Sequence, residues 1–208
     1  MRTILCFGDS NTWGAPPSLP SEELPRFPPH VRWPGVLAEQ LGEDHQVIEN
    51  GLCGRTTCYR DPVQGAWLSG LDHLPVSLLT HDPLDLVILM LGTNDLKSRF
   101  NADARTIANN VGTLVETVWA HSGEELPVLV ICPPQAKKVS IPRSPFAGAD
   151  ARSEAFPREF ARMAVEKQVS WIDAGEFVVS SDLDGIHLEA NAHRLLGEVV
   201  TDKVRTLL

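Results

Sequence analysis

Short, almost unbroken apolar runs alternate along this chain with longer stretches whose apolar residues recur at helical spacing. The short runs predict five strands, over residues 3–7, 46–49, 85–90, 128–132 and 170–173. Unbroken apolar runs are typical of parallel strands buried on both faces, because strands with one solvated face alternate apolar and polar residues. The alternation of strands with helices therefore predicts an α/β fold in which helices cover both faces of a parallel sheet.

The longer stretches predict four helices, over residues 32–41, 104–119, 152–167 and 190–207. Apolar residues in 104–119 follow the i, i+3, i+4, i+7 spacing of a helix that packs one face on a core. The last stretch repeats this stripe with Leu195, Leu196, Val199, Val200 and Val204. His193 in the same stretch is expected on the surface. Pro157 either kinks the third helix or begins it.

Two segments rich in proline, residues 15–34 and 133–146, follow predicted strands. Proline lacks an N–H donor and fixes φ, so neither segment is expected to form a regular helix or a central strand. Long ordered loops at the carboxyl edge of a sheet are usually walls of a functional site. Because these segments fit such loops better than linkers, a single domain over residues 1–208 is the economical interpretation.

The net charge and the cysteines of the chain indicate which binding partners and which cellular compartment to expect. The formal net charge of −9 argues against nucleic acid or an anionic membrane as a partner, since both require clustered Lys and Arg. No apolar run approaches the roughly 20 residues that cross a bilayer, and the N-terminus has no signal-peptide pattern. The four cysteines have no metal-type spacing, and no paired Cys/His cluster is present. We expect a cytoplasmic protein without a metal or other cofactor.

Four polar motifs follow predicted strands. They are GDSN at residues 8–11, NGLCGRT at 50–56, GTND at 92–95 and DGIH at 184–187. In an open α/β sheet, ligands bind outside the carboxyl ends of the strands, where the strand order reverses. The four motifs are therefore expected to meet at one rim of the sheet.

Ser10, His187 and Asp184 supply the three groups that a serine hydrolase needs. Asp184 precedes His187 by three residues, a spacing at which both side chains can point the same way and the carboxylate can accept from Nδ1–H. The Nε2 atom then remains to take the proton of Ser10. The chain lacks the Gly-x-Ser-x-Gly elbow of α/β-hydrolases, so serine chemistry here requires another scaffold.

An oxyanion hole can be assembled from the same motifs. Ser10 is expected at the first turn of a helix, where its backbone N–H is unpaired. Gly54 can bring its N–H close to a substrate oxygen, and Asn94 can donate from its side chain. Taken singly, each motif has a structural alternative, because Asp, Ser and Asn are preferred helix caps and glycine is common in turns.

The order Ser10, Gly54, Asn94, His187 resembles the SGNH (or GDSL) hydrolase family, and the resemblance covers essentially the whole chain. It implies a flavodoxin-like three-layer α/β/α sandwich with a five-stranded parallel sheet, and ester hydrolysis through an acyl-enzyme. The nucleophile, base and orienting acid would be Ser10, His187 and Asp184. The oxyanion hole would consist of the N–H groups of Ser10 and Gly54 and the side chain of Asn94.

Residues 4–14, 32–41, 85–95 and 184–187 look like the arylesterase/acyltransferase branch of this family. That likeness implies a homo-oligomer that acts on short acyl esters and can transfer the acyl group to alcohols. Asn11 departs from the leucine of the commonest Gly-Asp-Ser-Leu motif. The residues expected beside the acyl or alcohol pocket are Asn11, Trp13, Lys97 and Ile186.

Two other functions are compatible with the sequence. The family also contains acetylxylan-type deacetylases, and the proline-rich loops could form a groove for a carbohydrate. A binding module of the same fold could instead hold an anion at the Gly8–Ser10 turn. Anion binding gives no reason for the distant Asp184-x-x-His187 pair, which favours the enzyme.

Overall fold

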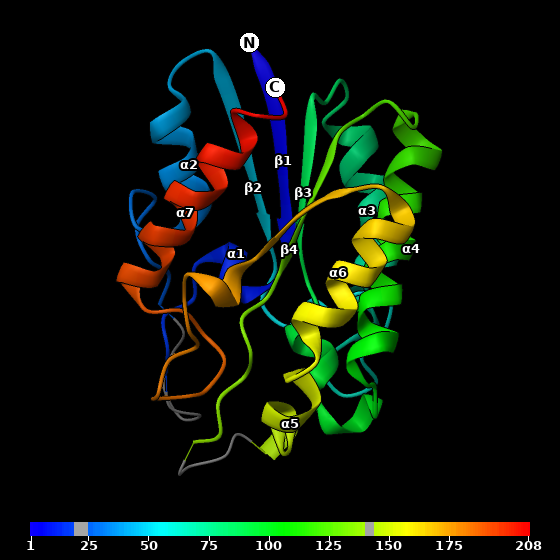
Figure 1. Ribbon diagram of the computed structural model, residues 1–208, viewed down its shortest axis with the longest axis vertical. Coiled ribbons are helices and arrows are strands. Elements are labelled where there is room, and N and C mark those ends of the chain that lie inside the picture. The colour runs from blue at the N-terminus through cyan, green and yellow to red at the C-terminus, as the bar shows by residue number, and fades with distance from the viewer. Residues whose placement is uncertain (19–24, 140–143) are drawn as a thin grey trace.

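A computed structural model describes residues 1–18, 25–139 and 144–208. Pro20 and Pro142 of the two proline-rich segments lie outside the described residues. The structure has one five-stranded parallel sheet with the order β2-β1-β3-β4-β5 (Figure 1). The strands are β1 (Arg2–Gly8), β2 (His45–Gly51), β3 (Leu86–Met90), β4 (Val128–Cys132) and β5 (Ser170–Asp173). All five predicted strands and their parallel pairing are confirmed.

Helices pack on both faces of this sheet, which confirms the three-layer α/β/α fold (Figure 1). Ile4 and Cys6 of β1 belong to a core cluster shared with α2 (Trp33–Leu41) and α7 (Ala190–Val204). Leu5 and Phe7 belong to the opposite cluster, shared with α3 (Gly70–Thr80), α4 (Ala104–Ser122) and α6 (Phe156–Lys167). Alternate residues of β1 thus enter different cores, which explains why its sequence is apolar at every position from 4 to 7.

The helices follow the predictions with two differences. The apolar residues that form the predicted stripe of α4 are all buried: Ala104, Ile107, Ala108, Val111, Leu114, Val115 and Val118. Pro157 lies in the first turn of α6, so it begins that helix, and a separate short helix, α5 (Ala149–Ser153), precedes it. Helix α3, which contains Pro75 in its interior, is not among the predicted helices.

The surface position expected for His193 is wrong, because this side chain has no exposed area. His193, Leu196 and Val200 follow the i, i+3, i+7 spacing of one helical face, and all three are buried against the rest of the protein. The ring of Phe27 packs edge-on against the imidazole, with 5.5 Å between ring centroids. Leu195, which the predicted stripe included, is instead 41% exposed.

The strand order reverses at β1, since β2 lies on one side of it and β3 on the other. Short elements follow the carboxyl ends of the strands there: α1 (Ser10–Trp13), η1 (Ala66–Leu68), η2 (Thr93–Leu96) and η3 (Ser98–Phe100). Two more, η4 (Ser144–Phe146) and η5 (Ala174–Glu176), follow β4 and β5. The predicted motifs therefore lie at the edge of the sheet where ligands bind in folds of this type.

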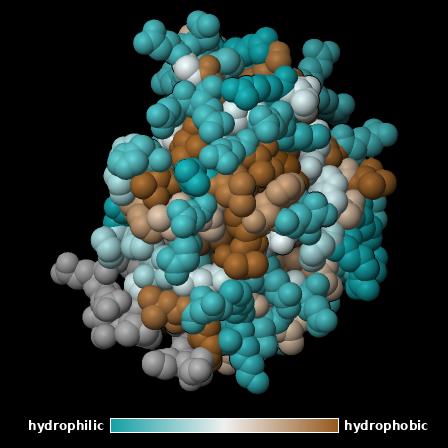
Figure 2. Space-filling model, turned by 60° about the vertical axis from the view of Figure 1, so that its left-hand side comes forward, coloured by the Kyte–Doolittle hydropathy of each residue, from teal (hydrophilic) through white to brown (hydrophobic). Residues whose placement is uncertain are grey.

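One face of the molecule carries a surface feature that bears on partners. On the face shown in Figure 2, apolar side chains gather in a central patch bordered by hydrophilic ones. None of the helices in the described residues combines the length and the apolar composition of a membrane span.

Candidate active site

Ser10 lies at the start of α1, directly after β1, because Gly8 lets the helix turn tightly off the strand. A Cβ atom on Gly8 would lie 2.0 Å from Thr12 Oγ1 and 2.8 Å from the Met90 carbonyl oxygen. The carboxylate of Asp9 caps α1 by accepting the N–H of Asn11 at 3.0 Å. Since Asp9 serves as the cap, the hydroxyl of Ser10 is left for other contacts.

Ser10, His187 and Asp184 form one continuous line of hydrogen bonds. The Nε2 atom of His187 lies 3.0 Å from Ser10 Oγ, and its Nδ1 atom lies 2.6 Å from Asp184 Oδ2. All three residues are at most 6% exposed. The line joins groups that are 177 residues apart in sequence, as the sequence analysis expected.

Asp184 is held in the orientation that this line requires. Its Oδ1 atom accepts the backbone N–H groups of Ile186 and His187 at 3.0 and 2.9 Å. Burial acts to raise the pKa of Asp184, but the hydrogen bond and charge of His187, with these two N–H groups, outweigh it and lower the pKa. An ionised Asp184 accepts from Nδ1–H, so the Nε2 atom of His187 is the proton acceptor that faces Ser10.

Three N–H donors of the predicted oxyanion hole have no acceptor among residues 1–18, 25–139 and 144–208. They are the backbone N–H groups of Ser10 and Gly54 and the side-chain amide of Asn94. The segments that carry them converge on Gly8, which accepts the N–H of Leu52 at 3.1 Å and pairs with Met90 of β3. Gly54 has φ +87°, a conformation that side chains disfavour. Unpaired donors of this kind can stabilise a developing negative charge.

Asn11 joins the serine turn to the histidine loop. Its side-chain amide donates to the carbonyl of Ile186 at 3.2 Å and accepts the N–H of Leu188 at 3.1 Å. These are the two residues that flank His187. The predicted substrate contact of Asn11 stays a prediction, while its amide is engaged by the backbone of the protein.

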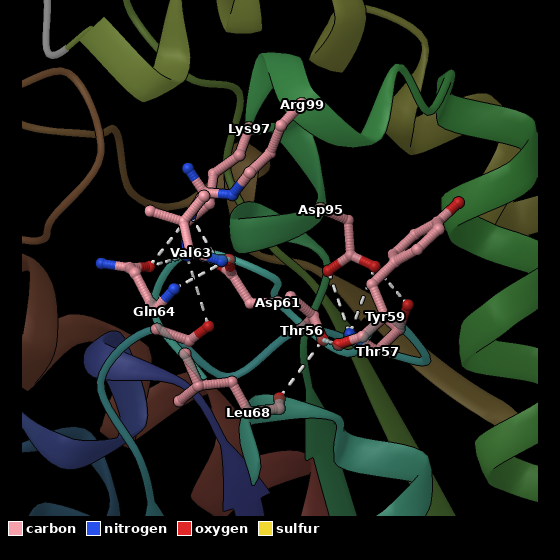
Figure 3. A network of polar contacts seen from close by, with 11 residues as sticks. Thr56, Thr57, Tyr59, Asp61, Val63, Gln64, Leu68, Asp95, Lys97 and Arg99 are labelled. Atoms are coloured by element: carbon pink, nitrogen blue, oxygen red, sulfur yellow. Dashed lines mark hydrogen bonds and ion pairs between the residues drawn. The ribbon is translucent and has the colours of Figure 1, made fainter. Parts of the chain in front are cut away.

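The other predicted pocket residues differ in their surroundings. Ile186 is 5% exposed and, with Asp184 and Phe146, borders a cavity of about 350 Å³. Trp13 is half-buried, and the guanidinium of Arg26 lies 5.1 Å from its ring centroid. Lys97 is only 2% exposed, and its ammonium group contacts Asp61 and Gln64 (Figure 3). It also lies 3.5 Å from the carbonyl oxygen of Gly54.

Several buried polar residues around the site were not singled out from the sequence. Arg55 donates to the carbonyl oxygens of Gly8 and Asn50 at 2.8 and 2.5 Å, which ties the ends of β1 and β2 together. Burial lowers the pKa of Arg55 to about 10 and raises that of Asp9 to about 6. Arg55 belongs to the motif at 50–56, but nothing local in the sequence distinguishes it from a surface arginine.

The described part of the chain contains no group of three or more His, Cys, Asp or Glu residues that could hold a metal ion. The polar groups at the site are instead arranged as a nucleophile, a base, an orienting carboxylate and N–H donors. Such a set can support acyl transfer to and from Ser10.

Comparisons with known proteins agree with this chemistry. The model of the GDSL-like Lipase/Acylhydrolase family matches residues 6–195. The structure of the native M. smegmatis aryl esterase is 40% identical, with a TM-score of 0.94 and full coverage of both chains. Its inhibitor-bound form is also 40% identical over both full chains, with a TM-score of 0.92.

A second similar structure is Est24, a carbohydrate acetylesterase from Sinorhizobium meliloti. It is 39% identical, with a TM-score of 0.92 and full coverage of both chains. No curated protein sequence matches the chain.

Proposed function

This chain belongs to the GDSL-like lipase/acylhydrolase family and is a carboxylic ester hydrolase, and we propose that it cleaves short acyl esters through an acyl-enzyme on Ser10. The observation that carries the proposal is the line of hydrogen bonds from Asp184 through His187 to Ser10. The three N–H donors without an acceptor among the described residues support it.

In the first half of the reaction, Ser10 Oγ attacks the ester carbonyl carbon and its proton passes to His187 Nε2, 3.0 Å away. The carbonyl oxygen becomes an oxyanion, which accepts hydrogen bonds from the N–H groups of Ser10 and Gly54 and from Asn94. Collapse of this intermediate breaks the bond to the alcohol oxygen, and the alcohol leaves with the proton from His187. Asp184 remains ionised and stabilises the imidazolium.

In the second half, water attacks the acyl-enzyme and repeats these steps with the carboxylic acid as product. An alcohol in place of water yields a new ester, so the same residues carry acyl transfer. We expect p-nitrophenyl acetate with added benzyl alcohol to give benzyl acetate in competition with acetate. Chromatography of the products measures the partition, and acetate alone at every alcohol concentration would exclude transfer.

Ser10→Ala tests the nucleophile directly. The variant is expected to lose p-nitrophenyl acetate turnover and labelling by a fluorophosphonate, since both require the hydroxyl oxygen. Equal turnover by the variant and the wild type would remove Ser10 from the mechanism. A wild type that resists labelling but binds inorganic phosphate tightly would favour the anion-binding module.

Short acyl groups are proposed because relatives of about 40% identity are an aryl esterase and a carbohydrate acetylesterase. We expect kcat/KM to fall along a series of p-nitrophenyl esters from acetate to octanoate. A steady rise along the series would contradict a preference for short acyl chains.

A carbohydrate deacetylase is the second candidate. The full-length similarity to Est24 favours it, and the cavity beside Ile186 is bordered by the polar residues Lys137, Lys138 and Asp150. Comparing kcat/KM for acetylated xylose with kcat/KM for phenyl acetate discriminates the two substrates. A value for the sugar ester at least as high as that for the aryl ester would support the deacetylase.

The predicted homo-oligomer stays a prediction, as do the single domain and the cytoplasmic location. The apolar patch in Figure 2 supports association, because exposed apolar patches often mark contact surfaces. Sedimentation velocity would measure the oligomeric state.

A further inference from the structure

The two loops that supply oxyanion donors are joined by a buried polar network (Figure 3). One loop, residues 52–65, carries Gly54, and the turn η2 carries Asn94. Each donor therefore lies in a segment that contains no long helix or strand to fix its position. The relative placement of the two donors depends on contacts between these segments.

The first contact joins Asp95 to Thr57. Asp95 follows Asn94 directly and has no exposed area, while Thr57 lies three residues after Gly54. The two carboxylate oxygens accept the backbone N–H of Thr57 at 3.0 and 3.2 Å, and one of them also accepts its hydroxyl. Burial raises the pKa of Asp95 to about 7. Burying the carboxyl group of Asp95 costs free energy, and its hydrogen bonds with Thr57 offset that cost. These bonds hold the loop of Gly54 against η2.

The second contact centres on the buried carboxylate of Asp61. Its Oδ1 atom accepts the N–H groups of Val63 and Gln64 at 2.9 and 3.1 Å, which shapes the loop itself. Its Oδ2 atom pairs with Lys97 Nζ at 3.3 Å and with Arg99 Nη2 at 2.5 Å. Both cations follow Asn94 within five residues, so Asp61 binds the loop to the segment that carries Asn94.

Lys97 completes the link to the oxyanion donor. Its ammonium group contacts the carbonyl of Gly54 at 3.5 Å and also donates to the side chain of Gln64. Its backbone N–H donates to the carbonyl of Asn94 at 3.3 Å. A single residue thus contacts both Gly54 and Asn94.

Stability alone is a poor explanation for such an ion pair. The side chains of Lys97 and Asp61 are 3% and 0% exposed, so both ions have lost most of their water. Replacing buried ion pairs by apolar residues is often neutral or stabilising, because desolvation can exceed the Coulomb gain. Donors of an oxyanion hole, in contrast, need accurate placement, because a misplacement of about 1 Å can cost about 10²-fold in rate.

We propose that Lys97 is a positioning residue of the oxyanion hole, which acts with Asp61 and the Asp95–Thr57 contact to hold Gly54 at a set distance from Asn94. This role rests on the proposed esterase mechanism and extends it. The substrate contact that the sequence suggested for Lys97 stays a prediction beside this role.

Lys97→Met is the direct test, since methionine keeps most of the length and loses the charge. Misplacing a donor costs less than the roughly 10²–10³-fold in kcat that follows its removal, so we expect kcat/KM for p-nitrophenyl acetate to fall about 10- to 100-fold. Affinity for an aryl trifluoromethyl ketone, which forms a hemiketal oxyanion on Ser10, should fall by a similar factor. Lys167→Met is the matched control, because Lys167 pairs with Glu116 on the surface of α6 and α4.

A second pair of variants keeps the test independent of whether Lys97→Met folds. Thr57→Val removes the hydroxyl donor to Asp95 at nearly constant volume, and Thr57→Ser retains it. We expect Thr57→Val to lower kcat/KM and ketone affinity together, and Thr57→Ser to restore most of both.

Unchanged kinetics in Lys97→Met and Thr57→Val would overturn the positioning role. A fall in kcat/KM with unchanged ketone affinity would also overturn it, because Lys97 would then act on something other than the oxyanion. If the wild type neither cleaves esters nor labels at Ser10, the proposed function itself fails and takes this role with it. An active wild type with unaffected variants removes only the positioning role.

Discussion

We predict that His193 weakens the folded state in acid, although it lies outside the line of catalytic groups. Its imidazole is fully buried and neither ring nitrogen has a hydrogen-bond partner among the described residues. Burial, reinforced by the charges of His187 and Arg32, lowers its pKa from 6.5 to about 4. At a pH between these two values, His193 is therefore neutral in the folded chain and protonated in the unfolded chain.

The size and sign of the effect follow from this difference in pKa. Between pH 6.5 and pH 4 the unfolded state binds the proton on His193 and the folded state does not, so the contribution of His193 to stability falls as the pH falls. The loss is about 2 kcal/mol between pH 7 and pH 5, and about 3 kcal/mol once both states are protonated. Asp9 and Asp95 have raised pKa values, so they act in the opposite direction in the same range.

Comparison with His193→Leu isolates the histidine, because the contribution of the two carboxyl groups is present in both proteins. Urea unfolding followed by tryptophan fluorescence gives the free energy of unfolding at pH 7 and pH 5. We expect the wild type to lose about 2 kcal/mol more than His193→Leu over this range. The exposed His121→Leu is the control and should behave as the wild type.

The same pH dependence in wild type and His193→Leu would contradict a lowered pKa of His193 in the folded protein. It would mean that the buried imidazole gains a partner on protonation, or that the first turn of α7 opens and admits water at low cost. Hydrogen exchange of that turn at pH 5 would distinguish these two explanations.

Three further predictions concern the site and its surroundings. Asp184→Asn should lower kcat about 10⁴-fold, because an amide no longer selects the His187 tautomer that can accept from Ser10; steady-state kinetics measure this. Asn11→Leu removes both hydrogen bonds to the residues beside His187, and we expect a drop of about 10-fold in kcat with KM little changed. Burial raises the pKa of all four thiols, so we expect native protein at pH 8 to react slowly with a chromogenic disulfide reagent. Absorbance should show four equivalents of released reagent thiol per chain only after unfolding.

The strands could be predicted from sequence because the sheet is covered on both sides. Each residue of β1 from Ile4 to Phe7 enters one core or the other, so burial leaves an unbroken apolar run. The end of such a run marks the carboxyl edge of the sheet, and the GDSN motif begins there. The apolar run followed by a polar motif thus predicted that Ser10 lies at this edge of the sheet. The same pattern predicted that the loop of His187 lies close to Ser10.

Elements whose burial departs from the simple pattern could not be predicted in the same way. Pro75 lies inside α3, and an interior proline argues against a helix because it removes a hydrogen bond. His193 lies on the apolar face of α7, but its polar type argues for solvent. In both cases tertiary contacts outweigh the intrinsic preference of one residue.

The polar network behind the oxyanion donors is the part that sequence reasoning misses, for a different physical reason. Lys97 and Asp95 stand in a short polar stretch, and such a stretch usually indicates a solvated loop. Their burial depends on Asp61 and Thr57, which lie 36 and 38 residues away. A buried charge is tolerated only when a partner meets it, so its environment is a property of the pair and not of the local pattern. Periodicity can therefore predict which segments reach the rim, whereas the spacing of the donors on that rim rests on long-range polar pairs that only the folded structure reveals.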